Sequence, residues 1–427
     1  MSRHTPLSAA AQSLRAHSLT LSSLDTDTDT ELELLADIVG DSRVVALGEG
    51  VHFGAEFGAA RRRLLRYLAT RCGFSVLAFE FGFAEAAPLD AWLHGQGADA
   101  DLSRMIGTTN SGLNSTMARW LRLHNTTSAH PVRLVGLDTP VAGGTLRPVL
   151  EPLIGYLSEV DPENAELARS LLTVDARIEG DSIAAAAARW ADLPVAEQTA
   201  LTSTLSRLSV RMRALEPLYL RRGDRAGYEL ARHHLAVATH ADYMFATIHG
   251  LLFGGQVLPM DSSVRDRLMA DSLLWHLERL DPDTRIVLMA HNNHIQKTPV
   301  EFEGPLAYSL GCYLAEALGS DYTAVAFTHT AESVPEMVPD AAQPIGFTIV
   351  DTAVGPPPPG SVEGELSAAG LAGHNSLCDL RPLRGDPAIN LSSMRAQSDQ
   401  MPTRVVDAFD AVLTVPTVTT EVELTLG

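Results

Sequence analysis

Four short apolar segments that each end in acidic or histidine side chains constrain the fold of this chain more than any other feature. The first, Val44–Leu47, is followed by Glu49 and His52 in the run VVALGEGVH. The others are SVLAFEF at 75–81, VRLVGLD at 132–138 and RIVLMA at 285–290, which lead to Glu80, to Asp138, and to His291 and His294. If all four are parallel strands, their carboxyl ends meet at one edge of a sheet, where α/β proteins bind ligands. The sequence therefore predicts that these ionisable side chains converge.

Segments with helical periodicity alternate with the strand-like segments. The helix predicted over 56–72 has an apolar stripe that contains Phe57, Leu64 and Leu68. Further helices are predicted over 84–94, 115–125, 261–280 and 305–319, and further strands over 322–327 and 409–415. Strands that alternate with helices indicate an α/β fold, with a mostly parallel sheet flanked by helices.

One long segment differs from this pattern. Residues 146–252 are rich in Ala, Leu and Arg, show helical periodicity and contain no strand-like run. We therefore divide the chain into a first part of the α/β core (1–140), a helical insertion (141–255) and a second part of the core (256–427). An insertion of this size is expected to form a lid or wall over the strand ends, and to build most of the substrate pocket.

Charge and cysteine content exclude several classes of partner. The formal net charge is −20, whereas nucleic acids and anionic membranes select basic surfaces. No segment approaches the roughly 20 consecutive apolar residues of a membrane span, and the N-terminal residues lack the apolar run of a signal peptide. The three distant cysteines fit a reduced cytoplasmic protein better than a disulfide framework or a thiolate metal site. We expect a small-molecule substrate, and the oligomeric state stays open.

The predicted cluster of three carboxylates and three imidazoles suits two kinds of chemistry. In the first, a histidine is a general base for water, and neighbouring donors stabilise an oxyanion at a carbonyl. In the second, the same residue types bind a divalent metal that activates the water. The spacings Glu49-x-x-His52 and His291-x-x-His294 differ from HExxH and are compatible with both. A serine nucleophile is not supported, because the chain has no GxSxG motif.

Two features near the strand ends predict how charge is arranged. Arg61, Arg62 and Arg63 are consecutive, so on a helix they point about 100° apart and cannot all face the same site. Arg61 is predicted to face the carboxylates, and Arg62 and Arg63 to lie on the solvated face. Glu80 belongs to a buried strand, where an isolated carboxylate is costly, so it is predicted to be paired or to lie at the mouth of the sheet.

The segment ALGEGVHFGAEFGAARRRLLRYLATRCGFSVLAFEFGFAEA, residues 46–86, resembles the signature of the erythromycin esterase family. That signature has a GE-x-x-H turn, an arginine-containing helix that ends in RYL, and a strand that ends in Glu. Similar segments follow at VGLDT (135–139), SVRDRLMADSLLWHLE (263–278), MAHNNHI (289–295) and FDAVLTV (409–415). The resemblance spans about residues 30–415, which is nearly the whole chain.

The resemblance implies a metal-independent hydrolase of macrolide lactone rings, which is an antibiotic-resistance activity, or a relative connected with succinoglycan biosynthesis. By motif position, His52 is similar to the general base that activates water, and Glu49 would orient it. The other implied catalytic residues, which position substrate and stabilise charge, are Arg61, Glu80, His291 and His294. The residues assigned to substrate binding are Asp138, Phe53 and Asn293. Because Phe53 directly follows the base, it is expected to narrow or desolvate the pocket.

Three functions are therefore considered, in order of preference. The first is a hydrolase that opens a lactone or cleaves an ester of a macrolide-like or other natural product by His-activated water, without a cofactor. The second is a natural-product biosynthetic enzyme on the same scaffold that carries out dehydration, cyclisation or acyl chemistry. The third is a metal-handling or non-catalytic binding protein. No cofactor is expected for the preferred function, and a divalent metal is the alternative to this expectation.

Overall fold

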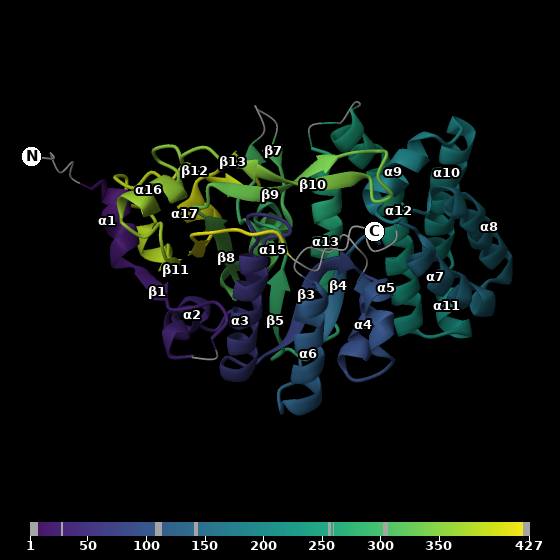
Figure 1. Ribbon diagram of the computed structural model, residues 1–427. Helices are drawn as coiled ribbons and strands as arrows, with labels where there is room; N and C mark the ends of the chain where they lie inside the picture. The colour runs from purple at the N-terminus through teal and green to yellow at the C-terminus, as the bar shows by residue number, and fades with distance from the viewer. Residues whose placement is uncertain are drawn as a thin grey trace, which may run out of the picture.

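The computed structural model describes residues 7–26, 29–106, 113–140, 144–254, 258, 260–301 and 306–421. Its centre is an eight-stranded sheet (Figure 1). In order across the sheet the strands are β1 (Ser18–Leu21), β11 (Asn375–Asp379), β14 (Ala411–Val415), β8 (Tyr322–His329), β2 (Val44–Leu47), β5 (Arg285–Met289), β3 (Phe74–Gly82) and β4 (Arg133–Asp138). The strands from β14 to β4 pair in parallel, whereas β11 and β1 are added antiparallel. The predicted mostly parallel α/β sheet is confirmed.

The four strands that were predicted to carry the site lie side by side, in the order β2, β5, β3 and β4. In β2, Val45 and Leu47 pack in the core on one face of the sheet, and Val44 and Ala46 pack in the core on the other face. Both faces are therefore apolar, which explains why these segments are continuously hydrophobic instead of alternating. Because the four strands are parallel, the residues that follow them gather at one edge.

Helices cover both faces of the sheet. One face packs against α2 (Glu33–Val39), α3 (Ala55–Arg71), α4 (Ala86–Leu93), α5 (Leu102–Ile106) and α6 (Ser115–Thr127). The other face packs against α1 (Ala9–Ala16), α13 (Ser262–Leu277), α15 (Leu310–Leu318), α16 (Val362–Ala368) and α17 (Val405–Ala408). None of the helices in the described residues combines the length and hydropathy that a membrane span requires.

The prediction that Arg63 lies on a solvated face of α3 was wrong. Its side chain is buried and pairs with Glu31 at 2.8 Å, because the segment that precedes α2 covers this side of α3. Arg62 is partly exposed and pairs with Asp25, which fits its predicted position near solvent. The difference arises from a contact between segments about 30 residues apart in the chain, which the periodicity of one helix does not reveal.

Between β4 and β5 the structure has α7 (Arg147–Val160), α8 (Pro162–Ile178), α9 (Ile183–Ala191), α10 (Val195–Ala214), α11 (Glu216–Arg222), α12 (Arg225–Phe253) and α13. The helices α7 to α12 share a hydrophobic core of their own. In Figure 1, α7, α8, α10 and α11 lie beyond the β4 edge of the sheet. The insertion therefore approaches the strand ends from this side, mainly through α9 and the end of α12.

Two hairpins that the sequence analysis did not predict complete the strand-end side of the molecule. The first pairs β9 (Ser333–Pro339) with β10 (Phe347–Ala353) and extends toward α9 (Figure 1). Ile345 and Phe347 of this hairpin form a small apolar cluster with Phe53 and with Ala184 of α9. The second hairpin pairs β12 (Ser393–Ala396) with β13 (Asp399–Pro402). Short strands β6 (Val300–Glu301) and β7 (Leu306–Ala307) also pair.

Two buried histidines and one half-buried histidine surround Phe83, where the insertion packs on the core. The ring centroids of His233, His234 and His276 lie 4.2, 5.8 and 5.2 Å from the centroid of Phe83. Burial lowers the pKa of His233 to about 3, and lowers the pKa values of His234 and His276 to about 4. The three rings are therefore neutral and pack as largely apolar groups.

Acid is expected to weaken this contact. Below the ordinary histidine pKa of 6.5, the unfolded chain binds a proton at His234 that the folded chain does not bind until about pH 4. The free energy of unfolding therefore falls as the pH falls from 6.5, by about 2 kcal/mol at about pH 5 from His234 alone. A His234→Leu variant is expected to lose this part of the pH dependence, as measured by urea unfolding. The exposed His130→Leu variant is the control, and an unchanged slope in His234→Leu would contradict the prediction.

Candidate active site

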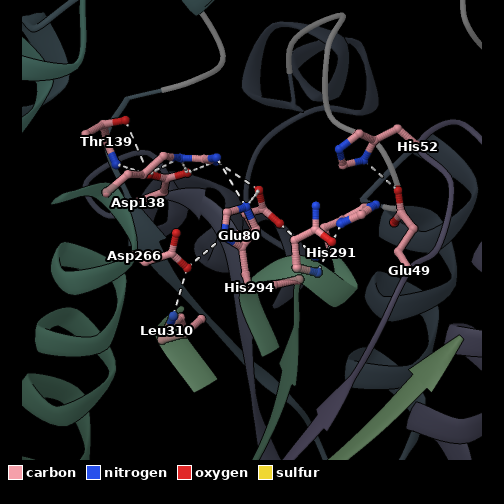
Figure 2. Close-up of polar contacts among 12 residues, drawn as sticks. Glu49, His52, Glu80, Asp138, Thr139, Asp266, His291, His294 and Leu310 are labelled. Carbon is pink, nitrogen blue, oxygen red and sulfur yellow. Dashed lines mark hydrogen bonds and ion pairs between the residues drawn. The ribbon is translucent and has the colours of Figure 1, made fainter. Parts of the chain in front are cut away.

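The side chains that follow the four central strands meet in one cluster at the carboxyl edge of the sheet (Figure 2). Glu49 and His52 follow β2, Glu80 lies near the end of β3, and Asp138 ends β4. His291 and His294 follow β5: His291 caps the short helix α14 (Asn292–Ile295), and His294 lies on it. All six side chains that were predicted to converge are therefore in the same place.

A chain of three residues holds the His52 ring. Nδ1 of His52 lies 2.8 Å from Oε1 of Glu49, and Oε2 of Glu49 accepts a hydrogen bond from Arg61. Arg61 also donates to the carbonyl oxygens of Gly48 and Ala290, at 2.9 and 2.8 Å. Because Glu49 accepts at Nδ1, the neutral His52 ring carries its proton there and leaves Nε2 free to accept another proton.

Solvent exposure differs sharply among Arg61, Glu49 and His52. Glu49 and Arg61 are 3% and 1% exposed, whereas the His52 side chain is 33% exposed. A buried carboxylate is costly unless it is paired, and the Arg61 guanidinium provides this pair. Arg61 therefore faces the carboxylates as predicted, and the histidine at the end of the chain remains accessible.

Two glycines allow the turn after β2 to lie close to its neighbours. A Cβ atom on Gly48 would come within 2.0 Å of Oδ1 of Asn292, and one on Gly50 within 2.6 Å of the carbonyl oxygen of Phe327. The backbone N–H of Asn292 also donates to the carbonyl oxygen of Glu49 at 2.9 Å. The turn that contains the Glu49 and His52 pair is therefore wedged between β8 and α14, and larger residues at either glycine would displace it.

Arg265 of α13 joins the carboxylates at the ends of β3 and β4. It contacts both carboxylate oxygens of Asp138 and donates to Oε1 of Glu80 at 2.8 Å. The other oxygen of Glu80 accepts from the backbone N–H of His291 at 2.9 Å. Glu80 is thus paired, as its position in a buried strand required. Asp138 is 0% exposed and its carboxylate binds Arg265; its assignment to substrate binding stays a prediction.

His294 is held between two carboxylates. Nδ1 lies 2.8 Å from Oδ1 of Asp266, and Nε2 lies 3.3 Å from Oε1 of Glu80. Burial lowers the pKa of His294, but the two carboxylates outweigh burial and raise the pKa to about 10. The ring is therefore an imidazolium whose Nε2 proton is donated to Glu80. Because Nε2 cannot then accept from Arg265, Nη1 of Arg265 has no acceptor within the described residues.

Alkaline pH is expected to destabilise the site as His294 loses its proton. The folded-state pKa of about 10 lies above the ordinary value of 6.5, so this stabilisation is complete below 6.5 and is lost as the pH rises through 10. We expect the thermal midpoint and any activity to fall together over this range. A His294→Gln variant should lack this titration in thermal melts recorded across the range. If it keeps the same alkaline transition, another group is responsible.

His291 has the opposite environment. Its Nδ1 accepts from the backbone N–H of Asn293 at 3.2 Å, so the neutral ring carries its proton on Nε2. That nitrogen is buried and has no hydrogen-bond partner within the described residues. Burial, followed by the neighbouring His52, lowers the pKa of His291 to about 3. The ring centroid lies 4.7 Å from that of His52, so an unused neutral donor is adjacent to the accessible histidine.

The cleft at this edge has two lobes, of about 200 and 330 Å³, and both are lined by His52 and Met337. Both lobes expose more apolar than polar surface. In the first lobe, the apolar lining includes Phe53, Ile183, Ala184, Leu252 and Phe347, and the polar lining includes Glu49, Arg61, Glu80 and Arg265. The second lobe has more polar side chains in its lining, among them His291, Asn293, His294, Asp266, Glu336, Tyr308 and Gln397. Among the described residues, the insertion contributes one side of the first lobe and no residue of the second lobe. The prediction that it builds most of the pocket was therefore wrong, because the β9–β10 hairpin closes the other side.

Comparison with known proteins identifies the family. The model of the family described as erythromycin esterase matches residues 69–418. The chain belongs to the erythromycin esterase family. It is 31% identical to the erythromycin esterase type II of Escherichia coli over 392 residues, which covers 91% of this chain and 93% of that protein. It is 33% identical to the type I enzyme of the same organism, with 90% and 93% covered. The chain is therefore an enzyme of the carboxylic-ester hydrolase type.

Solved structures agree with this assignment. A mutant of the erythromycin esterase EreC in its open conformation superposes with a TM-score of 0.88 and 30% identity, covering 95% of this chain and 98% of that one. A succinoglycan biosynthesis protein superposes with a TM-score of 0.70 at 18% identity, covering 96% of each chain. The second likeness concerns the fold alone.

Within this erythromycin esterase fold, the structure adds residues that the sequence analysis missed. Arg265 and Asp266 lie on α13, which was predicted only as an amphipathic helix. Asp266 stands in line with Met269, Ala270 and Leu273, and all four are buried. A charged residue at helical spacing from buried apolar residues is a signal for a buried ion pair, and it could have identified Asp266. Gln397 and Glu336 carry no comparable local signal.

The other residues predicted from the family resemblance have identifiable positions. Phe53 is buried, lines the first lobe and stacks on Phe347 with ring centroids 6.1 Å apart, so it narrows the cleft beside His52. Asn293 lines the second lobe. No group of three or more His, Cys, Asp or Glu residues suited to hold a metal ion occurs in the described parts of the chain. The two histidines of α14 are instead fixed by Asp266, Glu80 and the backbone.

Proposed function

We propose that this protein hydrolyses a macrolide-like lactone, or another bulky carboxylic ester, by means of water that His52 activates. The observation that carries the proposal is the chain from Arg61 through Glu49 to the accessible His52 ring. This arrangement fixes the tautomer with a free Nε2, and the buried Glu49 carboxylate stabilises the imidazolium that forms when the ring takes a proton.

The reaction would proceed as follows. Nε2 of His52 removes a proton from water while the water oxygen bonds to the ester carbonyl carbon, and the carbonyl oxygen becomes an oxyanion. The oxyanion then collapses, the bond from carbon to the alkoxide oxygen breaks, and the His52 imidazolium gives its proton to the alkoxide. The products are a carboxylic acid and an alcohol, joined in one molecule when the substrate is a lactone. His52 returns to its neutral state.

Two donors are available for the oxyanion. Arg265 lines the first lobe and His291 lines the second lobe. Nη1 of Arg265 and Nε2 of His291 have no acceptor among the described residues once His294 is protonated. A neutral imidazole and a guanidinium both donate to a developing negative charge, and the surrounding low dielectric strengthens the interaction. Glu80, Asp138 and Asp266 hold these donors in place without contacting the reacting atoms.

The substrate class follows from the two-lobed cleft and from the relatives. His52 lines both lobes, and each lobe exposes more apolar than polar surface, so a substrate whose reacting ester spans both must be large and largely apolar. A macrolide lactone has these properties, and the two curated relatives are named for erythromycin. The three cysteines of the chain are free, which supports a cytoplasmic location for the reaction.

The test is to incubate the purified protein with macrolides and with other large lactones in water enriched in heavy oxygen. The expected result is a product heavier by one water that carries a single labelled oxygen in its carboxylate. Loss of mass, or cyclisation without label, would instead support a biosynthetic dehydration or acyl reaction. Binding without any turnover would support a non-catalytic protein.

A metal-independent reaction is part of the proposal, because the donor set of the site is used by its own ion pairs. Dialysis against a strong chelator is expected to leave the hydrolysis rate unchanged. The rate is measured on the same lactone before dialysis, after dialysis, and after zinc, manganese or magnesium is added back. A rate that falls on chelation and returns with one metal would overturn this part of the proposal and favour a metal-activated water.

A further inference from the structure

Two turns with left-handed backbone meet at His52. Among the described residues, the non-glycine residues with positive φ are Phe53, at 62°, and Gln397, at 57°. Phe53 directly follows His52, and Gln397 begins the turn between β12 and β13. Left-handed backbone costs free energy in residues with a Cβ atom and persists only where the surroundings enforce it, most often at functional sites. Here both strained positions lie at the turn after β2: Phe53 belongs to this turn, and Gln397 binds it.

Gln397 holds the turn after β2 through its backbone and its side chain. Its N–H donates to the carbonyl oxygen of Gly50 at 2.7 Å, and its side-chain Oε1 accepts from the backbone N–H of His52 at 2.6 Å. The two hydrogen bonds lie on either side of Val51, so they fix both the position and the orientation of the peptide that carries the His52 ring. No regular secondary structure holds this segment.

The turn that carries Gln397 is itself fixed from two directions. Glu336 of β9 accepts from Nε2 of Gln397 at 3.3 Å and from the backbone N–H of Ser398 at 2.9 Å. On the other side, the buried Arg395 donates to the carbonyl oxygens of Ala331 and Gly355, at 2.8 and 2.7 Å. The hairpin therefore has little freedom to follow a displaced His52. Glu336 also links it to the β9–β10 hairpin, whose Met337 lines both lobes of the cleft.

We propose that Gln397 is a positioning residue for the reaction: it clamps the backbone of the turn so that the His52 ring stays on Glu49 with Nε2 toward the cleft. This inference rests on the proposed function, because it takes His52 as the base. If position 397 served only to close the hairpin, Gly or Asn would suit it better, because both adopt left-handed backbone more easily. Glutamine is the uncharged residue whose carboxamide reaches the His52 N–H from this position.

The experiment compares Gln397→Asn and Gln397→Gly with wild type. Both variants suit left-handed backbone, but the Asn carboxamide is one methylene shorter and Gly has none. We expect kcat to fall roughly tenfold to a hundredfold, as for a catalytic group displaced by about 1 Å, with KM changed by less than about twofold. The thermal midpoint should stay close to that of wild type, because the relief of backbone strain offsets the lost side-chain hydrogen bonds. The control is Gln400→Ala in the same hairpin, whose carboxamide binds Ser393 and which should keep wild-type kinetics.

A crystal structure of Gln397→Asn supplies a measurement that does not depend on turnover. We expect the 49–53 turn to shift and the hydrogen bond between His52 and Glu49 to be lost or lengthened. Three results would each contradict this role of Gln397. They are wild-type kcat in both variants, a 49–53 turn that does not shift, and a loss of activity matched by a fall in the thermal midpoint. If the wild-type protein hydrolyses no lactone, the proposed function fails, whereas the crystal structure still decides whether Gln397 holds His52.

Discussion

The His52→Ala protein is expected to lose roughly 10²- to 10⁴-fold in kcat/KM, the range that removal of a general base produces. The loss should fall on kcat, because the ring acts on the water and contributes little to binding of the bulky substrate. The fold should survive. The His52 side chain is one-third exposed, and Glu49 remains paired with Arg61 after the ring is removed. The measurements are steady-state hydrolysis of the lactone and a thermal melt of the same preparation.

Two controls make this result specific. His240→Ala removes a histidine of α12 whose ring binds the backbone carbonyl of Ala236 and does not line the cleft, so its activity should match wild type. Free imidazole added to His52→Ala should restore part of the rate, because the small base can occupy the space that the ring leaves. Activity retained in His52→Ala would remove His52 as the base and turn attention to the neighbouring histidines.

The strand ends could be predicted because the relevant signals are local. A continuous apolar run followed by a polar residue indicates a strand buried on both faces that ends at a sheet edge, and parallel pairing then brings distant residues together. This argument correctly placed Glu49, His52, Glu80, His291 and His294 in one cluster. It also placed Arg61, because the helix that follows β2 begins at the same edge of the sheet and Arg61 lies in its early turns.

The rest of the site could not be predicted because it depends on contacts between distant segments. Gln397 reaches His52 across 345 residues of sequence, and Arg265 reaches Asp138 across 127. Neither residue lies in a periodic pattern that marks it. The two-stranded hairpins and the antiparallel β1 and β11 were missed for a related reason. They are short, they mix polar with apolar residues, and their pairing is set by the surface they cover.

Replacing Arg265 with methionine is expected to cause the largest combined loss of stability and activity. Asp138 is 0% exposed, and Arg265 is the arginine that pairs it with Glu80. Removing one partner of a buried ion pair leaves an uncompensated charge and costs about 3–5 kcal/mol. We expect about 3 kcal/mol in urea unfolding, because the Arg265 side chain is 26% exposed and water screens part of the charge. The activity should fall as well, since a proposed oxyanion donor is lost.

Variants on the same helix separate these two effects. Arg267→Met removes an exposed pair with Asp271, two residues further along α13, and should change stability by less than about 0.5 kcal/mol. Arg265→Met combined with Asp138→Asn removes both charges, so part of the stability should return while activity stays low. Arg265→Lys keeps the positive charge but not the planar guanidinium that binds Asp138 and Glu80 at once. Compared with Arg265→Met, it should therefore regain more of the free energy of unfolding than of the hydrolysis rate. If Arg265→Lys instead restores the full rate, the charge alone is sufficient, and the geometry of the guanidinium, which ties the ends of β3 and β4 to α13, has no part in catalysis.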